Sequence, residues 1–330
     1  MRPSLTDLLS TARVVELALR SPFRGLTHRE AVLIEGPQGW TEFSPFAEYA
    51  DAEAATWLAA TIDFGWVEAP APVRTTVAVN ATLPAVAADE VAKTLEPFGT
   101  CRTVKVKVAE PGHVLADDVA RVAAARALLG PEGRIRIDAN GAWNVDEAEH
   151  AVHALARFDL EYVEQPCASV AELAELRARI KYMGIPIAAD ESVRKASDPL
   201  AVARAGAADI VVLKVQPLGG IHATFALANQ AGLPVVVSSA LETAIGIGMG
   251  LQLAAALPEL EFDCGLGTSA LFTDDVTDDR PLPTDGTIAV QRFTPTPQRL
   301  DKHAASPERR DWWLARLARC YELLAEQPGA

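Results

Sequence analysis

Three acidic residues recur at a constant interval in the middle of the chain, and their spacing suits a metal site. Asp138, Glu164 and Asp190 each end a short apolar run, and successive acids are 26 residues apart (138 to 164 and 164 to 190). Three carboxylates that meet repel one another unless a cation joins them, and Mg²⁺ prefers such oxygen ligands. The spacing therefore predicts Mg²⁺, with Mn²⁺ as the alternative ion, if the runs are neighbouring strands; otherwise each acid could cap the following helix.

Lysines stand in comparable positions on either side of these acids. In Thr103–Val108 the pattern K-V-K puts Lys105 and Lys107 on one face of a strand, where burial and mutual repulsion lower the pKa of an ammonium group. Such a lysine can act as a base, although K-V-K also occurs on exposed edge strands. Lys214 ends a later apolar run and falls on the wall opposite Lys107 if eight strands form a ring. The pair predicts acid/base chemistry on two faces of one bound molecule.

Two serines offer a further contact for an acidic substrate. Ser238 and Ser239 end another apolar run, just before a helical pattern begins. Hydroxyl groups and free backbone N–H groups at a helix start suit a carboxylate. Both serines could equally be simple helix caps.

The elements that must position these residues are strands alternating with helices. Eight β-branched runs are expected as strands: Thr76–Ala81, Thr103–Val108, Arg134–Asp138, Glu161–Glu164, Ile185–Ala189, Asp209–Lys214, Pro234–Ser238 and Glu261–Cys264. Ala- and Leu-rich stretches with helical spacing separate them, which predicts an α/β fold with a (β/α)8-type barrel. In such a barrel the C-terminal strand ends meet at one face, so the acids and lysines converge. A doubly wound sheet is the alternative, but no glycine-rich loop follows the first strand.

The two ends of the chain read as a separate unit. Residues 1–75 are expected to form an α+β capping domain, and residues 76–273 the catalytic barrel. The expected elements of the cap are the strands Val14–Leu19 and Ala31–Glu35, the loop Ser21–Arg29 between them, a candidate third strand Trp40–Phe43, and a helix over Asp51–Thr61. Residues 274–330 are acidic and proline-rich before a final helical pattern at Arg310–Leu324. We expect this tail to pack back on the cap.

Composition narrows the class of protein. The chain has 330 residues, 49% apolar and 22% charged, as in ordinary globular proteins. Its 30 basic and 44 acidic residues give a net charge of −14, which disfavours binding to nucleic acid or anionic membranes. Met1–Asp7 shows no apolar signal segment, no uncharged stretch is long enough for a bilayer span, and the four cysteines are far apart. We therefore expect a cytoplasmic enzyme with reduced thiols and a small-molecule substrate, either monomeric or homo-oligomeric.

The motifs together resemble a known family. The succession K-V-K, R-I-D-A-N, Y-V-E-Q-P, A-A-D-E-S, L-K and S-S-A-L-E is similar to the muconate-lactonizing-enzyme branch of the enolase superfamily. The resemblance covers nearly the whole chain. Within the branch it is strongest to the o-succinylbenzoate synthase family of the actinobacterial type. Sites of this superfamily pair a lysine or histidine base with Mg²⁺.

The resemblance implies a reaction and the residues for it. The family dehydrates 2-succinyl-6-hydroxy-2,4-cyclohexadiene-1-carboxylate to 2-succinylbenzoate, in menaquinone biosynthesis. The three spaced acids would hold Mg²⁺, and Lys107 would take the α-proton and then protonate the departing hydroxide in a syn elimination. Lys105 would lower the pKa of Lys107, and Lys214 would be a cation beside the ring. The opposite division of roles between Lys107 and Lys214 also fits the sequence.

Four more residues acquire roles from the resemblance. Glu191 would support the metal site from behind, and Asn140 and Arg136 would orient its metal end and the substrate. Arg24 lies in the segment Ser21–Leu26, which occupies the place of the family's mobile specificity loop. There it could meet a substrate carboxylate, or it could be an ordinary surface arginine.

Other activities remain open. N-succinylamino acid racemase uses the same metal and the same two lysines for 1,1-proton transfer. A metal-free Schiff-base aldolase on Lys107 or Lys214 would leave the three acids unexplained. A non-catalytic barrel used as a binding module would leave the whole constellation unexplained. A dipeptide epimerase is disfavoured because Cys264–Thr268 lacks the D-x-D pattern of those relatives.

Overall fold

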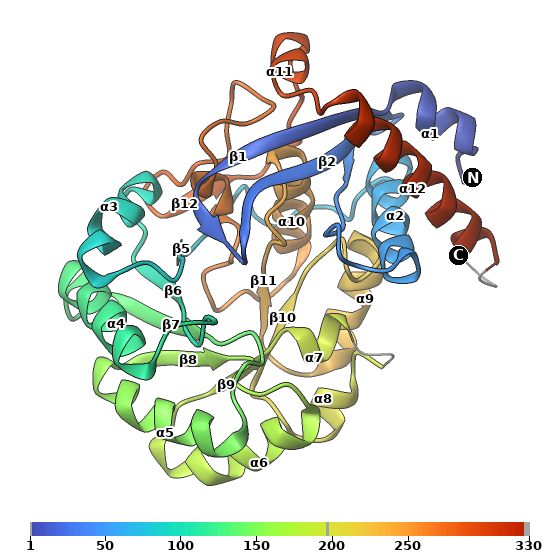
Figure 1. The fold of residues 1–330 in the computed structure, drawn as a ribbon. Helices are drawn as coiled ribbons and strands as arrows, with labels where there is room; N and C mark the ends of the chain where they lie inside the picture. Colours follow the sequence, from blue (N-terminus) through green and yellow to red (C-terminus); the bar gives the residue numbers. More distant parts are fainter. Residues whose placement is uncertain (1, 196–197, 327–330) are drawn as a thin grey trace.

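The centre of the molecule is a curled sheet of seven parallel strands. The computed structural model describes residues 2–195 and 198–326. The strands run in the order β11-β10-β9-β8-β7-β6-β5, with helices outside them (Figure 1). Their bounds are β5 Ala81–Leu83, β6 Thr103–Lys107, β7 Arg134–Asp138, β8 Leu160–Glu164, β9 Ile187–Ala189, β10 Ile210–Leu213 and β11 Val235–Val237. This is the expected barrel-type α/β fold.

The helices of the barrel follow the strands along the chain. They are α3 Val91–Leu95, α4 Leu115–Leu129, α5 Val145–Leu155, α6 Val170–Ile180, α7 Glu191–Arg194, α8 Ala201–Arg204, α9 Ile221–Ala231 and α10 Ala244–Ala256. Reciprocal side-chain caps start two of them, because Asn144 pairs with Glu147 at α5 and Ser169 pairs with Glu172 at α6. Apolar side chains fill the space between sheet and helices. This layer holds the strand ends in fixed positions.

The sheet closes without an eighth regular strand among the described residues. Val79 bridges Cys264, and Ser238 bridges Gly265, both in parallel sense. The expected strand Glu261–Cys264 is therefore wrong as a strand, and only its end joins the two edges. Glycine permits this junction, since a Cβ on Gly265 would stand 2.4 Å from the Ser238 hydroxyl oxygen.

The first expected strand, Thr76–Ala81, divides into two. Residues Thr76–Ala78 form β4, which pairs antiparallel with β12, Thr287–Ala289. The barrel begins only at Ala81, in β5. Thr76 and Ala78 are exposed, as suits a two-stranded ribbon outside the barrel.

A second, antiparallel sheet forms the cap. It contains β1 Arg13–Phe23, β2 Leu26–Gly36 and β3 Gly39–Phe43. Helices α1 Leu5–Thr11, α2 Asp51–Trp66 and α12 Pro307–Glu326 pack on it and on one another, so the first and the last helix both lie on the cap side (Figure 1). Trp313 of α12 is fully buried, with its ring centroid 6.0 Å from that of Phe43. The division into 1–75 with 274–330, and 76–273, stays a prediction.

The expected loop Ser21–Arg29 is wrong. Both strands continue through this segment as a hairpin. Its turn is Arg24–Gly25, where φ is 53° and 74°. Positive φ at both central residues is the geometry of a tight hairpin turn, and glycine adopts it freely.

Two expectations from composition concern the cysteines and membranes. Cys101, Cys167, Cys264 and Cys320 are all free and buried. Burial raises the pKa of the first three thiols to about 12, so they stay protonated and unreactive. In the described part of the chain, every helix is too short or too polar to cross a bilayer.

Candidate active site

The three spaced acids stand at the C-terminal ends of neighbouring strands. Asp138 ends β7 and Glu164 ends β8, and the two are partners in parallel register. Asp190 follows β9 directly, two residues beyond Ala188, the register partner of Glu164. Each of the three side chains is about 1% exposed. Strand alternation thus brings all three carboxylates to the inner face of the barrel mouth.

Two lysines of β6 neutralise part of this charge. Lys105 Nζ lies 2.9 Å from Glu164 Oε1 and 3.3 Å from Asp138 Oδ2, and Lys107 Nζ lies 2.5 Å from the same Asp138 oxygen. Burial lowers the pKa of Lys107 and Lys105 adds to this, although Asp138 opposes it. Burial acts on Lys105 too, but Glu164 and Asp138 outweigh it and raise its pKa. Lys105 is therefore a permanent cation, whereas Lys107 is better suited to give up its proton.

The opposite wall carries Lys214, directly after β10. Its Nζ lies 2.6 Å from Asp190 Oδ2, while Asp190 Oδ1 accepts a hydrogen bond of 3.0 Å from Arg194 Nε. Arg194 also contacts Glu191 Oε1 at 2.6 Å, and that oxygen accepts a further bond from Asn140 Nδ2 at 3.2 Å. Burial opposes ionisation of Asp190, but Lys214 and Arg194 hold its pKa below the usual range.

The donor set fits a hard divalent cation. The Lys105 ammonium between Asp138 and Glu164 shows that these carboxylates converge on one positive centre. Burial raises the pKa of Glu164 to about 7, and the charge of Asp138 adds to the rise, so a further cation would stabilise the ionised site. No ready-formed cluster of three metal-ligating side chains exists within residues 2–195 and 198–326. Each carboxylate instead faces an ammonium group, and binding an ion means exchanging that contact.

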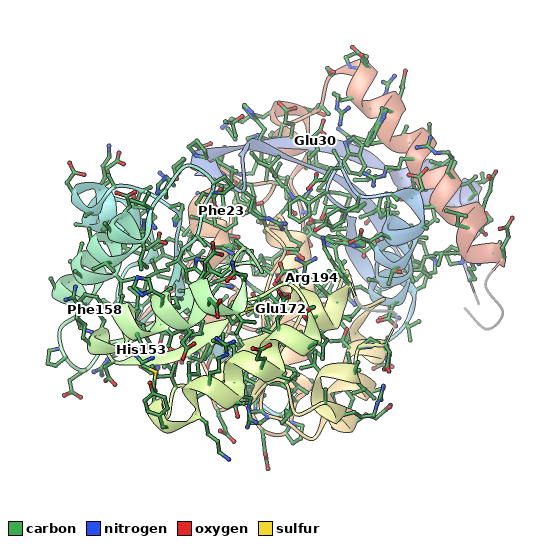
Figure 2. The ribbon with its side chains drawn as sticks, turned by 60° about the horizontal axis from the view of Figure 1, so that its bottom comes forward. Phe23, Glu30, His153, Phe158, Glu172 and Arg194 are labelled. Carbon is green, nitrogen blue, oxygen red and sulfur yellow. The ribbon has the colours of Figure 1, made fainter. Side chains whose placement is uncertain are left out.

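A small cavity of about 30 Å³ lies between the three lysines and the cap. The predicted residues that line it are Arg24, Lys105, Lys107, Asn140, Lys214, Ser238 and Ser239. Phe23, at the tip of the cap hairpin, closes one side, and Figure 2 shows it between the cap and the barrel helices.

The remaining predicted contacts of the cavity are Arg24 and the two serines. Arg24 is exposed, its guanidinium lies 4.7 Å from the Phe46 ring centroid, and no carboxylate of the described residues pairs with it. The N-cap of α10 is Thr243, so Ser238 and Ser239 are not its caps. Ser239 Oγ instead shares a hydrogen bond of 2.7 Å with Thr268 Oγ1.

Arg136 is the one predicted contact that does not reach the cavity. It is fully buried one layer below Asp138, and its Nε donates to Glu161 at 2.5 Å. A second nitrogen donates to Asn80 Oδ1 at 3.1 Å, and the guanidinium stacks 4.7 Å from the Tyr162 ring centroid. Nε and Nη1 are engaged inside the barrel, and Nη2 is buried without a partner among the described residues, so the structure places Arg136 outside the cavity and does not support the expectation that it contacts substrate.

The sequence reasoning missed several residues of the site. Phe23, Phe46, Thr82 and Thr268 line the cavity, and they come from four different segments. No local pattern marks them, because their meeting depends on how the cap sits on the barrel. Arg194 had a usable signal, since it stands four residues after Asp190 at the start of a helix, where such pairs face one another.

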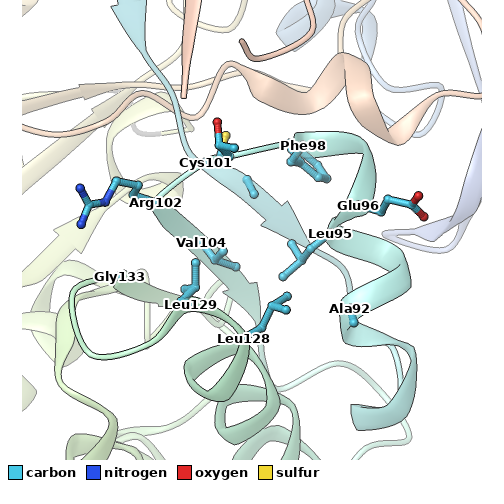
Figure 3. A pocket seen from close by; sticks show the side chains of 13 residues that line it. Ala92, Leu95, Glu96, Phe98, Cys101, Arg102, Val104, Leu128, Leu129 and Gly133 are labelled. Atoms are coloured by element: carbon cyan, nitrogen blue, oxygen red, sulfur yellow. The ribbon is translucent and has the colours of Figure 1, made fainter. Parts of the chain in front are cut away.

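A second cavity lies at the other end of β6, between α3 and α4 (Figure 3). Leu95, Phe98, Val104 and Leu129 line it together with Glu96 and Arg102. None of the predicted site residues borders it. The chemistry therefore belongs to the barrel mouth.

Comparisons with known proteins agree with this geometry. The family models "Enolase C-terminal domain-like" and "Enolase N-terminal domain-like" match residues 88–295 and 14–65. An o-succinylbenzoate synthase of Mycobacterium ulcerans (strain Agy99) is 54% identical over 327 residues, 99% of this chain and 98% of the relative. One of Mycobacterium tuberculosis (strain ATCC 25618 / H37Rv) is 55% identical over 328 residues, with the same coverage.

Solved structures agree on the fold. A muconate lactonizing enzyme from Pseudomonas putida superposes with a TM-score of 0.74 at 20% identity, over 89% of this chain and 98% of that one. One from Pseudomonas fluorescens complexed with muconolactone gives 0.76 at 22% identity, with the same coverage. At this identity the likeness concerns architecture alone.

Proposed function

The chain belongs to the o-succinylbenzoate synthases of the enolase superfamily, and we propose that its barrel-mouth lysines and acids carry out the reaction of that family. The reaction removes water from 2-succinyl-6-hydroxy-2,4-cyclohexadiene-1-carboxylate to give 2-succinylbenzoate, a step of menaquinone biosynthesis. One observation carries the assignment of residues. Lys107 and Lys214 border a single cavity from strands four places apart in the sheet, each beside a buried carboxylate.

We propose Asp138, Glu164 and Asp190 as ligands of Mg²⁺, with Mn²⁺ as the alternative. When bound, the ion supplies positive charge that makes the carbon–hydrogen bond next to the substrate carboxylate more acidic. Arg194 holds Asp190 through the oxygen that Lys214 does not contact. This keeps the carboxylate oriented while its other oxygen changes partner.

Lys107 is the proposed acid/base group. As a neutral amine it takes the proton from C1 of the substrate, and the C–H electron pair forms the C1–C6 double bond as hydroxide leaves C6. The same ammonium then gives its proton to the hydroxide, so that water departs from the face on which the proton was removed. Asn140 Oδ1 accepts a hydrogen bond of 2.7 Å from Lys107 Nζ and so directs it. The lowered pKa of Lys107 favours the first step.

Lys214 and the polar lining of the cavity complete the proposal. Lys214 remains charged on the other face of the ring and stabilises the negative charge that builds up as the proton leaves. Arg24 is proposed to bind the carboxylate of the succinyl arm, since it is a cation of the lining without an acidic partner in the described chain. Ser238 and Ser239 offer hydroxyl groups to the substrate's oxygen atoms.

The decisive test is the dehydration itself. Purified protein is mixed with the cyclohexadiene carboxylate and Mg²⁺, and the absorbance change on aromatisation is followed in the ultraviolet, then again with excess EDTA. We expect rapid turnover that EDTA abolishes and added Mg²⁺ restores. Absence of turnover with Mg²⁺ present would overturn the assignment, and turnover insensitive to EDTA would overturn the metal site.

A further inference from the structure

A carboxylate of the cap is buried where the cap meets the barrel mouth. Glu42, on β3, is fully buried, and both of its oxygens accept hydrogen bonds. Oε1 accepts from Ser44 Oγ at 2.6 Å, and Oε2 accepts from Thr243 Oγ1 at 2.6 Å and from the Gly246 backbone at 2.9 Å. Thr243 and Gly246 belong to the first turn of α10, so an acid of the cap caps a helix of the barrel.

The same network reaches the strand that carries Lys214. Ser44 N donates to Gln216 Oε1 at 3.2 Å, and Gln216 Nε2 donates back to Ser44 Oγ at 3.0 Å. Gln216 is fully buried and stands two residues after Lys214. A reciprocal pair of bonds fixes both partners more strictly than one bond, so the cap holds the end of β10 in place.

The network also borders the wall that contains the serines. Residues 238–241 line the cavity and lead directly into α10. Arg29, on β2, donates to the Leu241 carbonyl at 3.2 Å and also contacts the Ser44 carbonyl. Leu241 has a φ of 64°, a backbone conformation that needs support from its surroundings in a non-glycine residue. The support comes from the cap.

We propose that Glu42 is a positioning residue, which sets two walls of the substrate cavity through Gln216 and through the start of α10. The inference rests on the proposed function, because it assigns a role in binding that substrate. Glu42 touches neither the cavity nor the three proposed metal ligands. It acts on substrate through the Lys214 strand and the segment of residues 238–241.

The energetics of the site agree with a functional reason for this acid. Burial raises the pKa of Glu42 to about 7, and the nearby charge of Glu242 adds to the rise, while Ser44, Thr243 and Arg29 oppose it. An ionised acid here costs stability that an apolar residue of similar size would not. The Glu42 carboxyl group packs tightly against the backbone of α10, since a Cβ on Gly246 would stand 3.0 Å from Glu42 Cδ.

The experiment compares Glu42→Gln with a matched acid of the same sheet, Glu30→Gln. Glu30 is ion-paired with Arg309 of α12, and Figure 2 shows it high on the cap beside that helix. Two quantities are measured with saturating Mg²⁺: kcat and KM for the dehydration, and Kd for 2-succinylbenzoate by calorimetry. For Glu42→Gln we expect KM and the product Kd to rise about tenfold, with kcat falling less than about threefold, since the chemical groups themselves are intact. For Glu30→Gln both constants should stay at wild-type values.

Each outcome of this experiment either supports or overturns the positioning role of Glu42. Equal constants in the two variants, or a fall in kcat with KM unchanged, would overturn the positioning role. If Glu42→Gln does not fold, as judged by circular dichroism, Ser44→Ala replaces it, because it removes only the link between Glu42 and Gln216. There KM should rise about threefold, and an unchanged KM would overturn the proposal. Failure of the proposed function is separate, because it appears as an inactive wild-type protein before any variant is measured.

Discussion

The inner faces of β7 and β8 carry polar side chains in two successive layers, and the layers serve different ends. In the upper layer, Asp138 and Glu164 face lysines that line the cavity at the barrel mouth. In the lower layer, Arg136 and Tyr162 stack on each other and are fully buried. Two residues along a strand separate the layers, so alternation puts both inside the barrel. An inward-facing charged side chain can serve the reaction only where it borders the cavity and its present ion-pair partner can be replaced by a ligand.

The partners of each layer explain the difference. The carboxylates of the upper layer are held by ammonium groups on single flexible stems, which can move when a ligand arrives. In the lower layer, the planar guanidinium of Arg136 is fixed by Glu161, Asn80 and the Asp263 carbonyl. It also lies 4.7 Å from the Tyr162 ring centroid and 5.8 Å from that of Phe262. The upper layer is built for exchange, and the lower layer closes the barrel floor.

The largest expected effect breaks the upper layer. Lys107→Ala and Lys214→Ala should each lower kcat by about 10³-fold or more, because general acid–base and electrostatic contributions are both of that size. The thermal midpoint of unfolding should fall by only a few degrees, because Asp138 keeps Lys105 and Asp190 keeps Arg194 as a charged partner. Stopped-flow absorbance and circular dichroism provide the two measurements. Wild-type turnover in either variant would refute the assignment of that lysine.

The lower layer should respond in the opposite way. Arg136→Leu should lower the free energy of unfolding by about 3 kcal/mol, because it leaves Glu161, Asn80 and the Asp263 carbonyl without their donor. KM in the surviving folded protein should be unchanged. The matched control is Tyr162→Phe, whose lost hydroxyl has no hydrogen-bond partner in the described chain and should cost almost nothing. Urea unfolding measures both, and a large rise in KM for Arg136→Leu would return that residue to the site.

Replacing a proposed metal ligand should weaken Mg²⁺ binding more than replacing a residue that supports the ligand. Asp190→Asn should raise the Mg²⁺ concentration for half-maximal activity about 100-fold, because it removes a charged ligand. Glu191→Gln is the neighbouring control and should raise it about tenfold, since Glu191 acts through Asn140 and Arg194. Direct Mg²⁺ titration by calorimetry checks binding apart from turnover. An unchanged requirement in Asp190→Asn would show that the ion lies elsewhere.

The upper layer could be predicted from sequence because the position of each acid depends only on the strand that it ends or follows. Each of Asp138, Glu164 and Asp190 follows its own strand, and parallel strands bring such ends together whatever the rest of the chain does. The exclusion of Arg136 could not be predicted, because the same alternation applies to it and only the partners differ. Contacts between segments far apart in the sequence could not be predicted either. Glu42 and Thr243 are 201 residues apart in the chain.

Two errors in the fold have a similar cause. The run Thr76–Ala81 is uniformly suited to a strand, and only pairing decides that its first part joins β12 while the barrel starts at Ala81. The last expected strand has the composition of a strand but meets its neighbours through two bridges. The hairpin had a local signal, since Arg24–Gly25 is a two-residue turn with glycine in second place.

The smallest expected effect concerns the upper edge of the upper layer, where the cap contributes Arg24. Its guanidinium stacks on Phe46 and has no acidic partner in the described chain, so it can approach a carboxylate without breaking an ion pair. Arg24→Ala should raise KM about tenfold and leave kcat nearly unchanged, because an exposed contact to a non-reacting carboxylate contributes to binding alone. Arg24→Lys should recover part of the loss, since the charge returns without the planar stacking. A fall in kcat at constant KM would instead mean that Arg24 closes the hairpin over the reacting ring, which would extend the functional layer from the barrel into the cap.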